Sequence, residues 1–376
     1  MEAFNRIYDN INFYEYRNTY DDFENLDLEL VLGDLTRPIP KYTFFIPTYR
    51  RAHLLKECLE SVLRQKKVKD YEIIILENDE EKNSETEKFL KKYKNNKKIF
   101  YYKVKKPSIW RIHMGVKLAR SEWVSIICDD DFLMPNYLYT IDKILTKYPQ
   151  MEALGCNYKT MNYDFQANSE VGDKALGFVH RLKRDIRLFW NNQFNYLQDA
   201  NFISQYYYDH YYIREGVNPW LGIMYKKSNF LDVGGWNHFS YFNSCDWILN
   251  TNYLLRYNLY YTSEVLAVKR EGNGNDSANK ESKIDWMVVD YLYYKTFKPH
   301  LNFLEYDEKY VMAIMNNHFN MLGLKFSDID LIVDGKKLYA ESDFSSEMQD
   351  YYYQKRKEFV KKLYSKVEPL EVYTKF

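Results

Sequence analysis

Short apolar runs alternate with helix-like stretches from Tyr42 onward, and this alternation limits the possible folds more than any other feature of the sequence. The runs are rich in β-branched and aromatic residues, as strands are, and read YTFFIP, YEIIIL, IFYYKV and WVSII. Strands that are separated by helices indicate units in which neighbouring strands run parallel and each helix crosses over the sheet. The alternation therefore predicts a parallel sheet with crossover helices.

The stretches between these runs have the features of helices. In residues 53–65 the apolar side chains recur on one face of a 3.6-residue repeat, so that face is expected to pack on the sheet. Further helices are predicted at about 84–95, 110–119 and 136–148. The predicted fold class is α/β, with a Rossmann-like, mostly parallel sheet flanked by helices and a nucleotide-binding half at residues 42–150.

Polar residues follow three of the predicted strands at the point where each strand ends. They are Thr48 and Arg50 after the first strand, Glu77-Asn78-Asp79 after the second, and Asp129-Asp130-Asp131 after the fourth. Ligands of open α/β sheets bind beyond the carboxyl ends of the strands. The three groups are therefore predicted to line one crevice.

The three acids in the segment IICDDDFLMP are enclosed by apolar residues on both sides. Ordinary solvated acids stand among other polar residues, so three mutually repelling charges in this setting indicate a positive group beside them. The plain alternative is a solvated turn whose acids cap the helix that begins at Asn136.

The composition removes several classes of protein. Lys+Arg and Asp+Glu are equal at 53 each, which leaves no net charge to attract nucleic acid. No apolar window approaches the roughly 20 residues of a spanning helix, and the N-terminus lacks the pattern of a secretory signal. The cysteines are too widely spaced for a zinc site or a disulfide framework, and they stand at Cys58, Cys128, Cys156 and Cys245. These features predict a cytoplasmic protein with no nucleic-acid partner.

The flanks of the chain differ from its centre. Residues 1–41 are acidic and irregular in pattern and are treated as an N-terminal extension; they end in TRPIPK, whose two prolines indicate a linker or an edge segment. Residues 281–376 are predicted to be helical, and their last helix, at about 354–366, is basic and amphipathic. That helix is expected to dock on the protein, with peripheral contact to an anionic membrane as the alternative.

Five motifs occur in a fixed order: IPTYRR, ILEND, EWVSIICDDDFLMP, GIMYKKSNFLDVGGWN and SCDWIL. Together they resemble the inverting family 2 glycosyltransferases of the GT-A fold over residues 42–278. The resemblance implies a GT-A domain at 42–280, with an acceptor half at 151–280. It also implies transfer of a hexosyl or N-acetylhexosaminyl group from a nucleotide-sugar, with UDP as the expected nucleotide, to a hydroxyl of a growing glycan. The implied acceptor is a bacterial surface polysaccharide or a glycoprotein glycan, either lipid-linked or on a protein.

The resemblance also answers the question that the three acids raise. In the family such acids hold Mn²⁺ or Mg²⁺ against the diphosphate of the donor, and one acid contacts the ribose. If the segment is extended, Asp129 and Asp131 point to one side and Asp130 to the other. That geometry favours Asp131 and Asp129 as metal ligands, although spacing counted back from Pro135 favours the first two acids.

Other site residues are implied only by the resemblance. Asp246 matches the general base of inverting members, with a helix N-cap as the alternative; the family's Glu-Asp pair is here Cys245-Asp246. Base and ribose contacts are implied for Thr48, Arg50 and Asn78, with Glu77 or Asp79 accepting from the base. The remaining implied residues are Arg111 and His113 near the donor, with a plain helix start and a structural histidine as the alternatives. Trp236 is implied to stack on a sugar, or else it is a core ring after a turn. Arg270 is implied to lie on a flexible loop that closes over the diphosphate, or else on an ordinary surface loop.

Two rival functions remain open. A sugar nucleotidyltransferase shares the metal and a similar fold, but it is expected to carry a glycine-rich loop after the first strand, and IPTYRRAHLL has no glycine. A non-catalytic carbohydrate- or nucleotide-binding module would tolerate loss of the acids, whereas Asp129, Asp131 and Asp246 are all present. An enzyme is therefore the preferred prediction.

Overall fold

The structure is a computed structural model in which two compact units are distinguished. The larger unit comprises residues 18–238, 249–275 and 368–376, and the smaller unit comprises residues 1–17, 239–248 and 276–367. The structure describes residues 4–12, 20, 27–105, 115–162, 202–206, 221–234, 245–254, 256–271, 291–292, 295–296, 299, 308–321, 329–337, 346–366 and 369–372.

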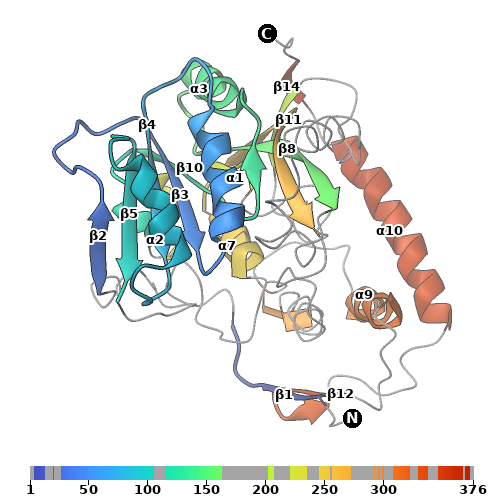
Figure 1. Ribbon diagram of the computed structural model, residues 1–376. Helices are drawn as coiled ribbons and strands as arrows, with labels where there is room; N and C mark the ends of the chain where they lie inside the picture. The colour runs from blue at the N-terminus through green and yellow to red at the C-terminus, as the bar shows by residue number, and fades with distance from the viewer. Residues whose placement is uncertain are drawn as a thin grey trace. The chain divides into compact units, whose positions relative to one another are not determined.

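The larger unit is built on one mixed sheet (Figure 1), with the strand order β14-β9-β11-β8-β10-β6-β3-β4-β5-β2. The strands are β2 Leu28–Leu32, β3 Tyr42–Thr48, β4 Tyr71–Glu77, β5 Ile99–Val104, β6 Trp123–Ile126, β8 Ala153–Asn162, β9 Phe202–Tyr206, β10 Met224–Lys226, β11 Leu259–Glu271 and β14 Pro369–Val372. A short strand, β7 Phe132–Leu133, pairs with β11. Strands β6, β3, β4 and β5 are parallel neighbours in that order, which confirms the predicted fold class.

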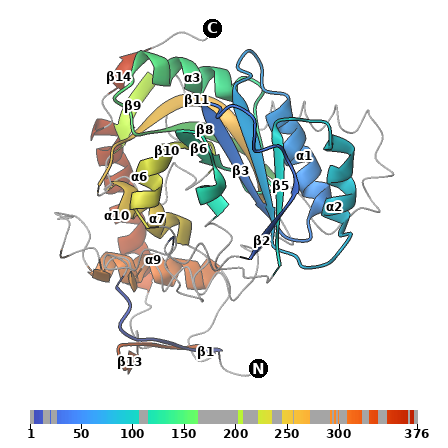
Figure 2. The ribbon, with the colours of Figure 1, turned by 90° about the vertical axis from the view of Figure 1, so that its left-hand side faces the viewer.

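The predicted crossover helices are also present. They are α1 Ala52–Leu63, α2 Glu85–Leu90 and α3 Tyr137–Lys147, and a short 3-10 helix, Lys91–Tyr93, extends α2. Figures 1 and 2 show α1 and α2 side by side over the part of the sheet that contains β3 to β5. The helix predicted at 110–119 lies outside the described residues up to residue 114, after which residues 115–118 form a 3-10 turn.

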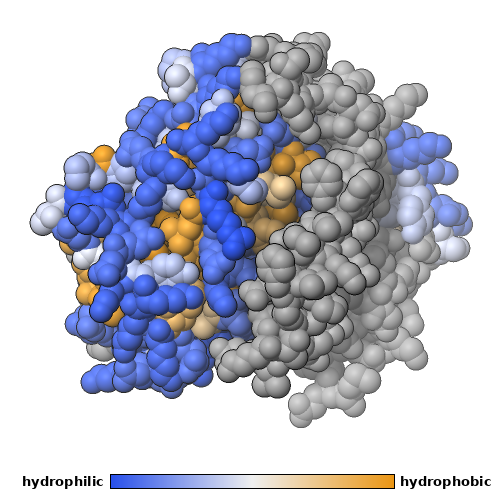
Figure 3. All heavy atoms as spheres, turned by 45° about the horizontal axis from the view of Figure 1, so that its top comes forward, coloured by the Kyte–Doolittle hydropathy of each residue, from blue (hydrophilic) through white to orange (hydrophobic). Residues whose placement is uncertain are grey.

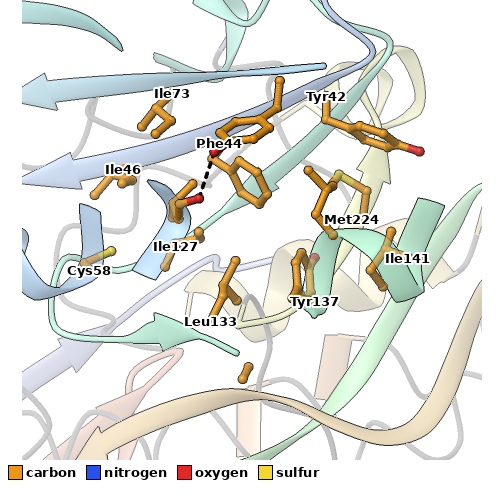
Figure 4. Packing of buried hydrophobic residues seen from close by; sticks show 14 of the residues in the cluster. Tyr42, Phe44, Ile46, Cys58, Ile73, Ile127, Leu133, Tyr137, Ile141 and Met224 are labelled. Carbon is orange, nitrogen blue, oxygen red and sulfur yellow. Dashed lines mark hydrogen bonds between the residues drawn. The ribbon is translucent and has the colours of Figure 1, made fainter. Parts of the chain in front are cut away.

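The core lies between the sheet and helices α1 and α3. Alternate residues of β3 point to this side of the sheet, namely Tyr42, Phe44 and Ile46, and all are fully buried. Figure 4 shows them packed with Cys58 of α1 and Tyr137 of α3. Each large side chain buried in this way contributes roughly 1.5–3 kcal/mol to folding. Among the residues that Figure 3 colours, most are hydrophilic, with smaller hydrophobic areas between them.

A buried ionic cluster joins the strands near their amino ends. The Glu72 carboxylate of β4 is fully buried and accepts hydrogen bonds from the Thr43 hydroxyl at 2.8 Å, the Arg120 backbone N–H at 2.9 Å and Arg120 Nε at 2.7 Å. The Arg120 guanidinium also donates to the carbonyl of Arg37 at 3.0 Å. This single carboxylate therefore connects β3, β4 and the segments that precede β3 and β6.

The N-terminal flank is more regular than predicted. Strand β2 pairs antiparallel with β5 and forms an edge of the main sheet, because Leu28, Leu30 and Leu32 alternate with exposed residues. Strand β1 Phe4–Tyr8 pairs parallel with β12 Ile329–Val333 in the smaller unit. The described residues of this extension therefore include two strands, and β2 lies at an edge of the main sheet.

The smaller unit contains the two long C-terminal helices. They are α9 Glu308–Met321 and α10 Ser346–Lys366, so the helical character predicted for this region is confirmed. Tyr352 of α10 is buried and stacks on Tyr310 of α9 with ring centroids 6.2 Å apart, which supports docking of α10. The short strands β12 and β13 Lys336–Lys337 were not predicted.

No helix in the described ranges has the length and apolarity needed to cross a membrane.

Substitution of Glu72 tests the buried cluster. Glu72→Ala leaves Arg120 without its carboxylate partner in a buried setting, and we expect the free energy of unfolding to fall by about 3 kcal/mol. Glu85→Ala is the matched control, because Glu85 pairs with Lys88 on the exposed surface of α2 and is expected to contribute less than about 1 kcal/mol. Urea unfolding of both variants measures the difference, and equal losses would contradict the role of Glu72.

Gly115 tests packing on the other face of the sheet. A Cβ at Gly115 would lie 2.6 Å from the Phe45 ring and 2.7 Å from Leu76 Cδ2, so Gly115→Ala is expected to cost about 1–3 kcal/mol. Gly155→Ala is the control, since its Cβ would meet nothing closer than 3.3 Å. The melting temperature of Gly115→Ala should lie well below that of Gly155→Ala. The reverse order would refute the close approach of residue 115 to Phe45 and Leu76.

Candidate functional site

The three acids lie in a tight turn between β6 and β7. The Asp131 backbone N–H donates to the Cys128 carbonyl at 3.0 Å, which closes a turn over residues 128–131. The segment is therefore not extended, and the argument that Asp129 and Asp131 point to one side does not apply to it. The turn instead brings carboxylate oxygens of Asp130 and Asp131 and the sulfur of Cys128 within 4.8 Å of one another.

Asp129 is connected to the end of the neighbouring strand β3. Its Oδ2 accepts a hydrogen bond of 2.6 Å from the Thr48 hydroxyl, and its Oδ1 lies 3.7 Å from Arg51 Nη1. Thr48 and Asp129 are both buried. The structure thus brings together two of the three predicted strand ends, as expected for parallel neighbours.

Asp131 is held from the opposite side by β11. Its Oδ1 accepts a hydrogen bond of 3.0 Å from the Arg270 backbone N–H. The side chain of Arg270 is fully buried, with Nη2 3.0 Å from Glu57 Oε2 of α1 and the guanidinium 5.2 Å from the Phe132 ring centroid. Arg270 lies within β11, which continues in register with β8 past this point, so the prediction that it belongs to a flexible loop is wrong.

The electrostatics of the turn favour a bound cation. Burial and the neighbouring Asp130 carboxylate raise the pKa of Asp129 to about 7, while Arg51 opposes this shift. Burial, and again Asp130, raise the pKa of Asp131 well above its usual range. Carboxylates crowded together in this way are stabilised in their charged form when a cation joins them.

The donor set fits a hard divalent ion. Oxygens on opposite sides of one Mg²⁺ lie about 4.2 Å apart, because each Mg–O distance is about 2.1 Å. The donor atoms of Asp130 and Asp131 lie within 4.8 Å of one another. Oxygen ligands suit Mg²⁺ and Mn²⁺, whereas the Cys128 sulfur suits softer metals.

The end of β4 contributes a second ionic pair. Arg50 Nε donates to Asp79 Oδ2 at 2.7 Å and Arg50 Nη2 donates to Asp79 Oδ1 at 3.3 Å, and the guanidinium lowers the pKa of Asp79. The Asn78 backbone N–H donates to the Thr48 carbonyl at 2.9 Å. The predicted residues Thr48, Arg50, Asn78 and Asp79 therefore lie together where β3 and β4 end.

Glu77 has a different place from the other predicted residues. Its carboxylate is fully buried and accepts hydrogen bonds from the Ser84 hydroxyl at 2.8 Å and from the Tyr101 hydroxyl, and it lies 3.5 Å from Lys103 Nζ. Ser84 is also the N-cap of α2, where it accepts from the Glu87 N–H at 3.1 Å. Glu77 thus anchors the loop that carries Asn78 and Asp79, and its carboxylate is occupied by internal partners.

Several predicted residues fall outside this description. Arg111, His113 and Trp236 lie outside the described residues. Asp246 is the second residue of α7 Cys245–Leu254, in its first turn rather than at an N-cap, and its side chain lies outside the described residues.

One residue near the acids was missed by the motif reasoning. Arg51 precedes α1 and its Nη1 lies 3.5 Å from Asp130 Oδ2. The only signal for it is its place next to Arg50 in IPTYRR, and the sequence does not show which arginine reaches which strand end.

Comparison with known proteins supports the resemblance. Residues 43–196 match the sequence model of a family described as Glycosyl transferase family 2. A search of curated proteins gives no match.

Solved structures share the fold. S. aureus TarS 1–349 in complex with UDP superposes with a TM-score of 0.50 at 14% sequence identity, covering 77% of this chain and 76% of that chain. The complex of TarS 1–349 with UDP-GlcNAc gives a TM-score of 0.51 at 13% identity, with 85% and 81% covered. The mannosyltransferase PcManGT from Pyrobaculum calidifontis, in complex with GDP-Man and Mn²⁺, gives a TM-score of 0.48 at 14% identity, with 92% and 94% covered.

The identities are low, so the two TarS structures, with TM-scores of 0.50 and 0.51, establish the fold alone. The match to the family confirms what the motifs indicate, although it ends at residue 196 rather than near 278. Residues 43–196 of this chain are thus similar to Glycosyl transferase family 2, and the described part of the larger unit shares the fold of the TarS structures.

Proposed function

We propose that this chain is an inverting, metal-dependent glycosyltransferase that moves a sugar from a nucleotide-sugar to a hydroxyl of a growing glycan. The observation that carries the proposal is the buried acidic turn at residues 128–131, which is joined through Thr48 to the carboxyl end of β3. Buried carboxylates at strand ends of an α/β sheet are placed for a ligand of high negative charge that binds together with a cation.

The proposed cation is Mn²⁺ or Mg²⁺, and Asp131 is its first proposed ligand. Asp130 is favoured as the second, because it shares the group of close donor atoms, whereas Asp129 Oδ2 accepts a hydrogen bond from the Thr48 hydroxyl. Asp129 stays a predicted contact of the donor or the metal. When bound, the cation supplies Lewis-acid stabilisation of the negative charge on the departing nucleoside diphosphate.

The proposed donor is a UDP-sugar. Arg50, Asn78 and Asp79 form one polar group at the end of β4 that can orient a base and a ribose. The bound UDP and UDP-GlcNAc of the TarS structures support uracil, and a hexosyl or N-acetylhexosaminyl group fits the proposal. Glu77 is assigned to holding the loop rather than to contacting the base.

Transfer is proposed to proceed by direct displacement. Asp246 is the proposed general base, because a carboxylate suffices to accept a proton that the acceptor hydroxyl loses as its oxygen bonds to the anomeric carbon. The donor is assigned to residues 42–150 and the acceptor to residues 151–280. The proposed acceptor is a bacterial surface polysaccharide or glycoprotein glycan in the cytoplasm, and a lipid-linked acceptor would suit a basic α10 that contacts a membrane.

Nucleotide binding tests the donor and the metal together. We expect UDP with Mn²⁺ to raise the melting temperature, because a ligand at a hundredfold its dissociation constant adds about 2.7 kcal/mol, which is several degrees for a domain of this size. The same shift should be absent without Mn²⁺ and in Asp131→Asn, which keeps the shape of the side chain but removes its charge. The shift in melting temperature is measured by thermal unfolding with UDP, GDP, CMP and dTDP.

Asp27→Asn provides the matched control, since Asp27 pairs with Lys105 on the exposed surface. It should respond to UDP and Mn²⁺ as the wild type does. If no nucleotide shifts the melting temperature, the protein is better explained as a non-catalytic carbohydrate-binding module. If it forms a nucleotide-sugar from a sugar phosphate, a nucleotidyltransferase is favoured.

Asp246→Asn tests the general base. The variant should bind UDP and Mn²⁺ with wild-type affinity, because the acids of the turn are untouched, and it should lose sugar transfer by at least about 100-fold. The two measurements are the UDP-dependent melting shift and transfer from a radiolabelled UDP-sugar to an acceptor extract. Transfer at the wild-type rate would remove Asp246 from the mechanism.

A further inference from the structure

Three segments that lead into neighbouring parallel strands lie together at one edge of the main sheet. They are residues 33–41, 64–70 and 91–98, and they precede β3, β4 and β5. The segments touch, because the Lys41 backbone N–H donates to Asp70 Oδ2 at 3.2 Å and Lys98 Nζ donates to the Lys69 carbonyl at 2.7 Å. These three segments form the amino edge of the sheet, opposite the edge at which the acidic turn follows β6.

The amino edge is strongly basic, although the whole chain has no formal net charge. Its segments contain eleven Lys and Arg residues and two acids, Asp34 and Asp70. Most of the lysines are exposed. The positive charges act on one another: burial, and after it Lys69 and Arg37, lower the pKa of Lys98 to about 8. A concentration of like charge on one face attracts a partner of opposite charge.

Some lysines of the amino edge rest on aromatic rings. Lys92 Nζ lies 4.2 Å from the centroid of the Phe89 ring, and Lys98 Nζ lies 3.5 Å from that of the Tyr71 ring. A ring attracts an ammonium group through its quadrupole and carries no net charge. These contacts therefore order the lysine side chains and leave the positive charge of the amino edge in place.

The amino edge also exposes two large apolar side chains. Leu35 is 56% exposed and Ile39 is 70% exposed, the two highest values among large hydrophobic residues in the described part of the chain. Their segment is ordered, because Arg120 Nη1 donates to the carbonyls of Leu35 and Arg37 at 3.4 and 3.0 Å, and prolines flank Ile39 on both sides. Exposed apolar side chains among lysines are typical of a surface that lies on a membrane.

We propose that the amino edge binds the surface of an anionic lipid bilayer, with its lysines at the headgroups and Leu35 and Ile39 inserted between them. Each Lys or Arg close to such a surface strengthens binding about fivefold. The two apolar side chains favour lipid over a soluble polyanion, because only lipid removes them from water. The proposal goes beyond the proposed function and uses none of its site residues. Docking by this edge directs the acidic turn, at the other end of the strands, away from the lipid.

Co-sedimentation of the full chain with vesicles tests the charges. Vesicles of phosphatidylglycerol and phosphatidylcholine in equal parts should bind the wild type, and vesicles of phosphatidylcholine alone should not. Lys94→Gln with Lys97→Gln should weaken binding to the anionic vesicles at least about tenfold, because two exposed positive charges are removed. The matched control is Lys82→Gln with Lys105→Gln, which removes two exposed lysines beyond the carboxyl ends of β4 and β5. It should bind as the wild type does, because a strand of roughly 20 Å exceeds the Debye length of about 8 Å.

Leu35→Ser with Ile39→Ser tests the lipid itself, since this variant keeps every charge. It should bind the anionic vesicles at least about tenfold more weakly, because two apolar side chains no longer leave water. Wild-type binding by this variant would show that the amino edge attracts anions in general and would overturn the lipid proposal. All the substituted side chains are exposed, so the melting temperatures of the variants should match that of the wild type.

Two further results would also overturn the proposal. One is a wild type that does not sediment with the anionic vesicles. The other is a greater loss of vesicle binding in Lys357→Gln, on the exposed side of α10, than in Lys94→Gln with Lys97→Gln, which would assign the contact to α10. Neither result changes the expected melting shift with UDP and Mn²⁺, so the proposed function is tested separately.

Discussion

Three consecutive carboxylates are buried in one turn, and the architecture around the site depends on keeping them there. Each acid has a partner from a different element: Thr48 of β3 bonds Asp129, Arg51 lies beside Asp130, and the backbone of β11 bonds Asp131. Burial, and after it the Asp130 charge, raise the pKa values of Asp129 and Asp131, so the turn stays costly until a cation arrives. The proposed function depends on this electrostatic cost. Carboxylates whose charges are poorly compensated in the free protein bind a cation more strongly.

The sheet supplies rigidity on both sides of this turn. Before it, β6 is parallel to β3, and after it β7 pairs with β11, so the acids stand between two hydrogen-bonded segments. At the other end of the strands, Glu72 joins β3 and β4 to Arg120. The site therefore lies on the carboxyl side of a sheet whose amino side is held by a buried ion pair.

The loop after β4 shows how a charged residue can serve a site without touching a ligand. Glu77 accepts from Ser84 and Tyr101, and Ser84 in turn caps α2, so both ends of the loop are fixed by one carboxylate. Burial and the bond to Glu77 raise the pKa of Tyr101, which keeps its hydroxyl protonated as a donor. Asp79 and Arg50 can then meet in a preset orientation.

The sequence by itself determined strands β3, β4, β5 and β6 and helices α1, α2 and α3, because hydrophobic periodicity and β-branched runs are local properties. It also determined which polar residues follow β3, β4 and β6, and hence most of the candidate site. Only the tertiary structure decided that Asp129 to Asp131 form a turn, that Glu77 is internal, that Arg270 is in a strand and that Arg51 faces the acids. These outcomes depend on side chains from distant segments, and no pattern along the chain records which partner a charged group finds in space.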